Sequence, residues 1–204
     1  MVEVVVVYHS GYGHTKVQAD AVSRGAEAVA GVVSRLVSVD QVEQNCTTLD
    51  EADAIIFGAL TYMAGPSAQF KAFFDATSGR WAEQRWKNKL AAGFTNSAGL
   101  NGDKLNTLEQ FSLFAMQHGM IWVGLGLLPG NHTSKGSSED LNRLAGFLGA
   151  MAQSHADQGA ETVPGASDQR TAERLGKRVA EAASAGTKAL PNPCALLRSK
   201  KSFS

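Results

Sequence analysis

A short polar loop carries the residue types best suited to binding an anion. Residues 8–15 read Tyr-His-Ser-Gly-Tyr-Gly-His-Thr and follow an apolar run, residues 2–7, that only Glu3 interrupts. Apolar residues then recur at helical spacing, which predicts the order strand, tight loop, helix. Such a loop directs free backbone N–H groups and the positive end of the helix dipole at a ligand above the strand. Ser10 and Thr15 add hydroxyl donors, and the loop has no Lys or Arg, so neutral donors would hold a terminal phosphate.

Three kinds of phosphate-binding loop compete for this stretch. A P-loop ends in Gly-Lys-Ser/Thr, whereas residues 13–16 read Gly-His-Thr-Lys, so the P-loop is excluded. A dinucleotide fingerprint needs a third glycine where Lys16 stands, although Asp40 after the expected second strand leaves a ribose-binding role open. The third possibility is the hydroxyl-rich loop that surrounds the phosphate of FMN in flavodoxin-like proteins. The simplest alternative is a strand-to-helix turn without a ligand.

Two further glycine-bearing loops follow expected strands. The strands are residues 53–58 and 90–95, and the loops are residues 59–66 and 96–103. In an open parallel sheet, ligands bind beyond the carboxyl ends of the strands, so all three loops should face one crevice. The loop amides and the ring of Tyr62 would suit a flat heterocycle. Three such loops favour a ligand site more strongly than any one of them.

The remaining pattern predicts one α/β domain over residues 1–186 and a flexible basic tail over residues 187–204. The fifteen residues 124–138 form a loop long enough to be functional or mobile. Trp81 is expected in the wall of a ligand site or a subunit contact, and Trp86 in the core. Further strands are expected at residues 32–39 and 120–123, and helices at residues 14–30, 48–51, 67–78, 104–117, 137–148 and from 167 or 168 onward.

Composition limits the classes of partner. Lys plus Arg and Asp plus Glu both number 19, so no net field recruits nucleic acid or an anionic membrane, and a strongly acidic electron carrier is disfavoured. Cys46 and Cys194 show neither a metal-ligand spacing nor a disulfide pattern, as expected in a reducing cytoplasm. Glu3 stands where a signal peptide would be basic, and the longest apolar run is too short to span a bilayer. We therefore expect a cytoplasmic protein without nucleic-acid or membrane partners.

An ordered set of motifs resembles the WrbA-type NAD(P)H:quinone oxidoreductases, a flavodoxin-like family that binds FMN. The motifs are Ser10-x-Tyr12-Gly13-His14, Phe57-Gly58 with Gln69 downstream, Trp81-Ala82, and His118-Gly119-Met120. The resemblance covers most of the chain. It implies a flavodoxin-like, doubly wound, five-stranded parallel sheet with helices on both faces, in a homo-oligomer (dimer or tetramer) with sites near subunit junctions.

The implied activity is the transfer of two electrons from NADH or NADPH through FMN to a quinone by a ping-pong mechanism. No catalytic acid or base and no metal are implied, because amides around the ring edge can stabilise the reduced flavin. Two alternatives remain open. One is a flavodoxin-type electron carrier, and the other is an FMN-dependent reductase of free flavin, a nitro or azo compound, or a metal ion.

The resemblance also implies particular site residues. Tyr12 and Trp81 would border the bound nicotinamide nucleotide and quinone. The second loop reads Leu-Thr-Tyr-Met-Ala at residues 60–64, where the family usually has Pro-Thr-Arg-Phe-Gly, so the preference for NADH or NADPH stays open. The family's His-His-Gly is Gln-His-Gly here, so Gln117 and His118 are both candidates for the flavin contact. The implied FMN-binding residues are Ser10, Gly11, Tyr12, Gly13, His14, Thr15, Thr61, Tyr62, Met63, Asn96, Ser97, Ala98, Gly99, Leu100, Asn101, Gln117 and His118.

Overall fold

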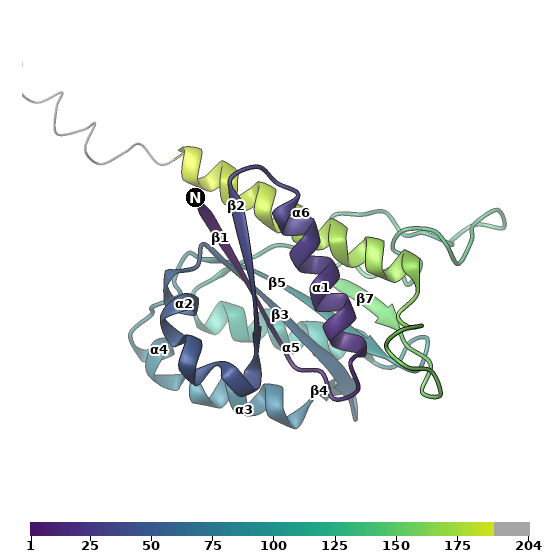
Figure 1. Cartoon of the computed structure of the whole chain (residues 1–204), viewed down its shortest axis with the longest axis horizontal. Coiled ribbons are helices and arrows are strands. Elements are labelled where there is room, and N and C mark those ends of the chain that lie inside the picture. The colour runs from purple at the N-terminus through teal and green to yellow at the C-terminus, as the bar shows by residue number, and fades with distance from the viewer. Residues whose placement is uncertain (190–204) are drawn as a thin grey trace, which may run out of the picture.

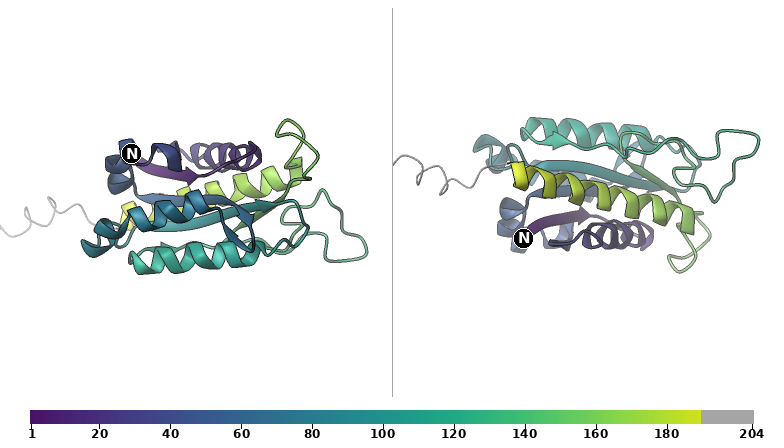
Figure 2. Two further views of the ribbon diagram at one scale, coloured as in Figure 1. Left: turned by 90° about the horizontal axis from the view of Figure 1, so that it is seen from below. Right: turned by 90° about the horizontal axis from the view of Figure 1, so that it is seen from above.

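A parallel sheet forms the middle layer of a three-layer α/β sandwich (Figures 1 and 2). The computed structural model describes residues 1–189, apart from the side chains of Glu43 and residues 187–189. Four strands run in the order β2-β1-β3-β5, and β6 and β7 share the next position, each parallel to β5. The short β4 pairs antiparallel with the end of β3. The strands are β1 (Val2–Tyr8), β2 (Val32–Ser38), β3 (Ala54–Tyr62), β4 (Gly65–Pro66), β5 (Leu90–Ser97), β6 (Ile121–Trp122) and β7 (Ala150–Gln153).

Helices cover both faces of the sheet, as Figure 2 shows. Helices α1 and α6 pack on one face, and α3 and α5 on the other. The short α2 and α4 lie beside α3 in Figure 1. The helices are α1 (His14–Glu27), α2 (Cys46–Glu51), α3 (Ala68–Ala76), α4 (Ser78–Ala82), α5 (Lys104–Gln117) and α6 (Ala166–Ala189), and two 3-10 turns (Val39–Gln41 and Glu43–Asn45) precede α2. Among residues 1–189, none of these helices has both the length and the apolar character needed to cross a membrane.

The central strands are apolar throughout because the sheet is covered on both sides. Val4 and Val6 face α1 and α6, whereas Val5 and Val7 face the layer that contains α3 and α5. On that second side the ring of Phe57 lies edge-on to Phe114, with 5.4 Å between ring centroids. Alternate residues of one strand therefore anchor opposite helical layers.

Helices α1 and α6 approach each other at backbone distance. A Cβ atom added at Gly176 would lie 1.9 Å from the carbonyl oxygen of Val22, and one at Gly25 would lie 1.9 Å from that of Glu173. Only glycine fits at such a crossing. The contact fixes α1, and with it the loop at its N-terminus, against the rest of the domain.

The predicted flavodoxin-like sheet and the helix at residues 104–117 are confirmed. The sheet position next to β5 was expected to hold a single strand, at residues 120–123. It is instead divided between β6 and the unpredicted β7, which residues 123–149 separate. The predicted helix at residues 137–148 is wrong, since this segment forms turns with positive φ at Asn142 and Ala145. The expected helix at residues 67–78 is α3, which ends at Ala76, and β3 continues to Tyr62.

The described part of the chain extends slightly past the predicted domain boundary. Helix α6 continues to Ala189, three residues beyond position 186. The rest of the predicted basic tail, residues 190–204, lies outside the described residues.

Two glycines of α6 give a matched test of this packing. Gly176→Ala should destabilise the protein by about 1–3 kcal/mol, because the new methyl group would force α1 and α6 apart. A methyl group at Gly186 on the same helix would meet no atom of another described element within 4 Å, so Gly186→Ala should raise stability by up to about 1 kcal/mol. Urea unfolding of the two variants measures both changes, and equal shifts would contradict the close approach.

Candidate cofactor and substrate site

A cavity of about 760 Å³ lies at the C-terminal edge of the sheet, and we call it the main cavity. The loops that follow β1, β3, β5 and β7 enclose it. Its volume is in the range of cofactor sites. Its lining residues are Tyr12, His14, Leu60, Thr61, Tyr62, Met63, Ala64, Asn96, Ser97, Ala98, Gly99, Gly102, Asp103, Ser154, Ala156, Gln158 and Gly159.

The first loop ends at the N-terminus of α1. Gly13 is the N-cap and has no side chain with which to cap the first N–H groups of this helix. The N–H groups of His14 and Thr15 in the first turn therefore have no helical acceptor and stay available to an anion. Ser10 stabilises the turn, since its hydroxyl accepts a 3.1 Å hydrogen bond from the backbone N–H of Lys16.

The side chain of His14 joins this loop to the loop after β7. Its Nε2 lies 2.9 Å from the carbonyl oxygen of Gln158. A carbonyl oxygen only accepts, so Nε2 carries the hydrogen. Tyr12 beside it is 77% exposed at the mouth of the cavity.

Two buried threonine hydroxyls orient that of Thr61 in the cavity wall. Thr95 donates to the carbonyl oxygen of Ala59 at 2.7 Å, so Thr95 Oγ1 accepts its 2.8 Å bond from Thr61. Thr61 has then used its only hydrogen, so Thr107 is the donor in the second 2.8 Å bond. The Thr61 hydroxyl can therefore only accept a hydrogen bond from a ligand.

The tip of the β3–β4 hairpin is strained and overhangs the cavity. Met63 and Ala64 have φ angles of 44° and 65°, a combination that two-residue hairpins usually reserve for Asn and Gly. The Nδ2 of Asn106 donates to the carbonyl oxygen of Ala64 and holds the turn. The turn leaves Met63 fully exposed and Tyr62 half-exposed at the rim.

The loop after β5 has its carbonyl groups bound by side chains of the protein. Gln153 Nε2 donates to the carbonyl oxygen of Ala98 at 3.1 Å. The Lys104 ammonium donates to the carbonyl oxygens of Gly99 and Leu100 at 2.8 and 3.0 Å. Within residues 1–189, the N–H groups of Gly99 and Leu100 have no protein acceptor. The loop therefore offers donors, but few acceptors, to a ligand.

The end of this loop requires a glycine. Gly102 has φ +57°, and a Cβ atom there would lie 2.1 Å from the hydroxyl oxygen of Ser97. That hydroxyl in turn donates to the carbonyl oxygen of Gly99 at 3.0 Å. The tight turn thus keeps Ser97 and Gly99 in place at the cavity wall.

Within the described part of the chain, two buried oxygen atoms in the cavity wall lack a hydrogen-bond partner. They are Asn96 Oδ1 and Ser154 Oγ, and each residue is 3% exposed. Leaving such atoms unpaired costs free energy that a bound ligand with hydroxyl or N–H groups recovers. The wall therefore favours a polar ligand over an apolar one.

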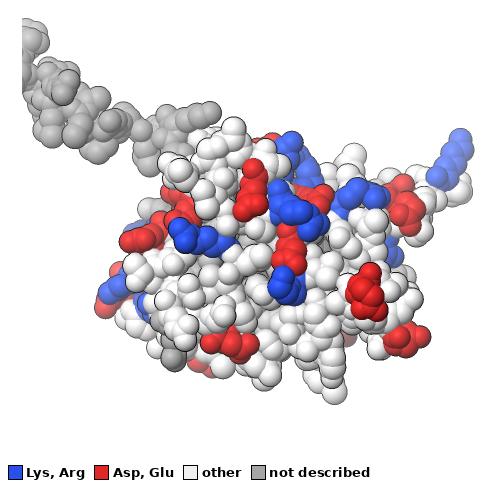
Figure 3. Space-filling view, viewed as in Figure 1, with Lys and Arg blue, Asp and Glu red and all other residues white. Residues whose placement is uncertain are grey.

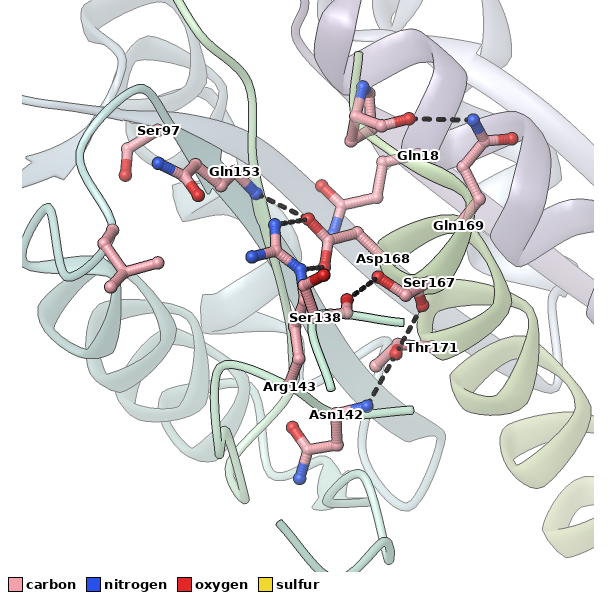
Figure 4. A network of polar contacts seen from close by, with 12 residues as sticks. Gln18, Ser97, Ser138, Asn142, Arg143, Gln153, Ser167, Asp168, Gln169 and Thr171 are labelled. Atoms are coloured by element: carbon pink, nitrogen blue, oxygen red, sulfur yellow. Dashed lines mark hydrogen bonds and ion pairs between the residues drawn. The ribbon is translucent and has the colours of Figure 1, made fainter. Parts of the chain in front are cut away.

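A mostly buried ion pair supports this wall from behind (Figure 4). Arg143 contacts both carboxylate oxygens of Asp168 at 2.8 and 2.7 Å. Asp168 also accepts from the backbone N–H of Gln153 at 2.9 Å. The start of α6 is thereby connected to β7, and through Gln153 to Ala98 of the cavity wall.

A second cavity of about 500 Å³ contains Trp81, Gln117 and His118. Of these, Gln117 and His118 lie at the C-terminus of the 14-residue α5, roughly 20 Å from the end that adjoins the main cavity. A single chain does not bring these residues to the main cavity. The lining residues are Lys71, Phe74, Asp75, Thr77, Ser78, Trp81, Gln110, Leu113, Phe114, Gln117 and His118.

His118 is neutral and has one unused nitrogen. Thr77 donates its hydroxyl hydrogen to the carbonyl oxygen of Phe74 at 2.7 Å, so His118 Nε2 must donate in its 3.0 Å bond to Thr77. Burial lowers the pKa of His118 to about 4. Its Nδ1 is buried without a partner and can accept from a group that enters the second cavity.

Sequence reasoning located much of the main cavity but not all of it. Of the expected residues, Tyr12, His14, Thr61, Tyr62, Met63, Asn96, Ser97, Ala98 and Gly99 line it, and Ser10, Gly11, Gly13 and Thr15 belong to the adjoining loop. Leu100 and Asn101 are exposed and do not line it, and neither does Asp40.

The residues after β7 were missed, because β7 itself was not recognised. These are Ser154, Ala156, Gln158 and Gly159. Their signal is a fourth polar loop with a glycine, directly after residues 150–153, which read Ala-Met-Ala-Gln and show no strand alternation of their own. Leu60, Ala64, Gly102 and Asp103 adjoin expected residues and were also omitted.

Comparison with known proteins identifies the family. Residues 6–133, more than half of the chain, match the family described as NADPH-dependent FMN reductase. The chain belongs to this family. It is therefore an FMN-dependent oxidoreductase of the flavodoxin-like fold, with FMN as its cofactor, and the predicted resemblance to WrbA is confirmed.

Three relatives cover nearly all of the described domain. "Flavodoxin FldP" of Pseudomonas aeruginosa is 46% identical, over 88% of this chain and 96% of the relative. An "NAD(P)H dehydrogenase (quinone)" of Geotalea uraniireducens is 31% identical, over 86% of this chain and all of the relative. The crystal structure of a flavodoxin, WrbA-like protein from Agrobacterium tumefaciens is 43% identical with a TM-score of 0.71, over 91% of this chain and 99% of that one.

Two serines test whether the main cavity holds the cofactor. Ser154→Ala removes an unpaired hydroxyl, so it should leave the stability of the apoprotein unchanged or higher and weaken FMN binding about fivefold. Ser23→Ala is the matched control, because it breaks a 2.9 Å bond to Ser34 between α1 and β2. That variant should lose about 1 kcal/mol of stability and bind FMN normally. Fluorescence titration of apoprotein and urea unfolding measure both quantities, and normal FMN binding by Ser154→Ala would contradict this placement.

Proposed function

We propose that FMN occupies the main cavity and passes two electrons from NADH or NADPH to a quinone in two successive half-reactions. One observation carries the placement: unpaired acceptors and free N–H donors occur together at the walls of one cavity of sufficient volume. FMN has matching groups, since its phosphate and ring edge accept and its ribityl hydroxyls both donate and accept. The quinone is supported by the relative from Geotalea uraniireducens, which is an "NAD(P)H dehydrogenase (quinone)".

Neutral groups bind the phosphate in this proposal. The loop from Ser10 to Thr15 supplies hydroxyl groups and the unpaired N–H groups at the start of α1. No Lys or Arg is among the residues that line the main cavity in the described chain. Asn96 Oδ1 and Ser154 Oγ are then available to accept from the ribityl hydroxyls.

The ring system is proposed to lie between the hairpin tip and the loop after β5. The N–H group of Gly99 would donate to an acceptor of its edge, and Thr61 would accept. Bound FMN supplies the redox chemistry. Tyr12 and Tyr62 at the mouth would then border the open side, where nucleotide and quinone bind in turn.

A second candidate function is electron transfer between proteins, as the name of the Pseudomonas relative suggests. A flavodoxin that docks on basic partners would need an acidic surface. The net charge of this chain is zero, and charges of both signs alternate on the face shown in Figure 3. These observations favour the enzyme.

Anaerobic stopped-flow mixing separates the two functions. An enzyme should lose its flavin absorbance within seconds of mixing with NADH or NADPH, and benzoquinone should restore it, since both substrates reach the same cavity. A carrier would be reduced by neither nucleotide without a partner protein. Slow bleaching, independent of nucleotide concentration, would contradict the proposed activity.

We also propose that Trp81 acts on the flavin of a second copy in a homo-oligomer. Trp81 and His118 lie in the second cavity, roughly 20 Å along α5 from the main cavity. The half-exposed Trp81 and the unpaired His118 Nδ1 would be completed by an approaching subunit.

Complementation tests this arrangement. Trp81→Ala should slow quinone turnover much more than it weakens FMN binding, because Trp81 is outside the main cavity. The Asn96→Leu variant should bind FMN poorly, but it can still supply an intact Trp81 to the site of a neighbouring subunit. Co-expression of the two inactive variants should restore part of the activity, because a mixed oligomer contains sites with both groups intact. No restoration in a verified mixed oligomer would show that Trp81 acts within its own chain or not at all.

A further inference from the structure

Lys104 is a buried cation directly behind the loop after β5. It is the first residue of α5 and is 1% exposed. Its ammonium uses all three hydrogens, at 2.8 Å to Ser97 Oγ, 2.8 Å to the carbonyl oxygen of Gly99 and 3.0 Å to that of Leu100. Ser97 and Gly99 line the main cavity. The charge thus lies one layer of residues behind the cavity wall.

No carboxylate in the described chain forms an ion pair with this ammonium. The carboxylate that acts on it electrostatically is Asp168, which is bound to Arg143. Burial lowers the pKa of Lys104 to about 8, Asp168 opposes this shift, and Arg143 adds to it. Lys104 therefore stays mostly charged at neutral pH, and its field is not cancelled by a contacting anion.

An uncompensated buried charge costs stability, so its retention calls for a functional reason. The position is also unfavourable for the helix, because a cation at an N-terminus opposes the helix dipole. Two effects on the main cavity follow from the contacts. The ammonium binds the carbonyl groups of Gly99 and Leu100 and leaves their N–H groups free, and it places positive charge near any ligand beside the loop.

We propose that Lys104 is a positioning residue that stabilises reduced FMN over oxidised FMN and so raises the midpoint potential of the bound cofactor. This inference rests on the proposed placement of FMN in the main cavity. Two electrons and one proton convert the oxidised ring to a reduced ring with one negative charge. The free N–H groups and the fixed positive charge of Lys104 both favour that added charge. The electrons come from NADH or NADPH, as in the proposed function.

The test compares midpoint potentials of FMN-loaded Lys104→Met, Lys104→Arg and Lys89→Met. Lys89 is the matched control, because its ammonium also donates to a backbone carbonyl, that of Ala52, and burial also lowers its pKa. It precedes β5 and so lies at the opposite edge of the sheet. Lys104→Met should weaken the binding of reduced FMN, relative to the binding of oxidised FMN, by on the order of tenfold. That ratio lowers the two-electron potential by about 30 mV.

The other variants should behave differently. Lys104→Arg keeps the positive charge, so its midpoint potential should stay close to that of the wild-type protein. Lys89→Met should leave the midpoint potential unchanged. If Lys104 only holds the loop in place, Lys104→Met would weaken the binding of oxidised and reduced FMN equally. The midpoint potential would then be unchanged. That result would overturn the proposal.

A pH profile of the wild-type protein keeps the proposal testable should Lys104→Met fail to fold. As Lys104 loses its proton near pH 8, the potential should fall more steeply with pH than FMN alone requires. Lys104→Arg should lack this inflection, because a guanidinium group does not titrate there. The charged groups that act on Lys104 are Asp168 and Arg143. Identical profiles would also overturn the proposal.

The serine variants separate this inference from the placement on which it rests. Unchanged FMN binding by Ser154→Ala would contradict the placement of FMN in the main cavity. The proposed role of Lys104, which depends on that placement, would be contradicted too. Weakened binding by Ser154→Ala, with unchanged potentials in Lys104→Met, would leave the placement standing and contradict only the role of Lys104.

Discussion

Every peptide group needs a hydrogen-bond partner, from the protein or from solvent, and at the C-terminal edge of this sheet the protein supplies partners unequally. In the loop after β5, side chains of Gln153 and Lys104 bind the carbonyl oxygens of residues 98–100. The N–H groups of Gly99 and Leu100 have no such partner in the described chain. At the start of α1 the geometry of any helix leaves further N–H groups free. The site is therefore rich in donors, as a phosphate and the acceptor-rich edge of a flavin require.

This unequal pairing depends on contacts far from the cavity. Gly25 and Gly176 let α1 and α6 approach at backbone distance, which fixes the N-terminus of α1. At the start of α6, Asp168 binds Arg143 and the backbone of Gln153, and Gln153 reaches the loop after β5 (Figure 4). The last helix thus supports two walls of the site. Substitutions in α6 can alter the cavity without touching a ligand.

The sequence predicted those parts of the site whose determinants are local. Apolar runs followed by glycine-bearing loops located β1, β3 and β5, and regular apolar spacing located α5. Strand β7 was missed because it is four residues long and has no β-branched residue. Its loss also hid Ser154 and Gln158 in the loop that follows.

Long-range contacts explain the other failures. Leu141, Leu144, Phe147 and Leu148 have helical spacing, yet the segment forms turns. The backbone N–H of Asn142 donates to Thr171 of α6, and its side chain accepts from the N–H of Gly146. Such partners are not visible in a local window. Lys104 did leave a local signal, because a cation in the first turn of a helix opposes the dipole and indicates an unusual partner.

The distribution of positive charge bears on how this site divides binding from redox control. The charge of a phosphate does not change when the ring is reduced, so a cation among the phosphate ligands would stabilise both oxidation states alike. Among the residues that the structure describes, no Lys or Arg lines the main cavity, and neutral donors face the expected phosphate position. The nearby cation, Lys104, lies instead behind the loop assigned to the ring. Charge at that position acts on the difference between the two oxidation states, which is the quantity that decides whether a nucleotide can reduce the flavin and a quinone can reoxidise it.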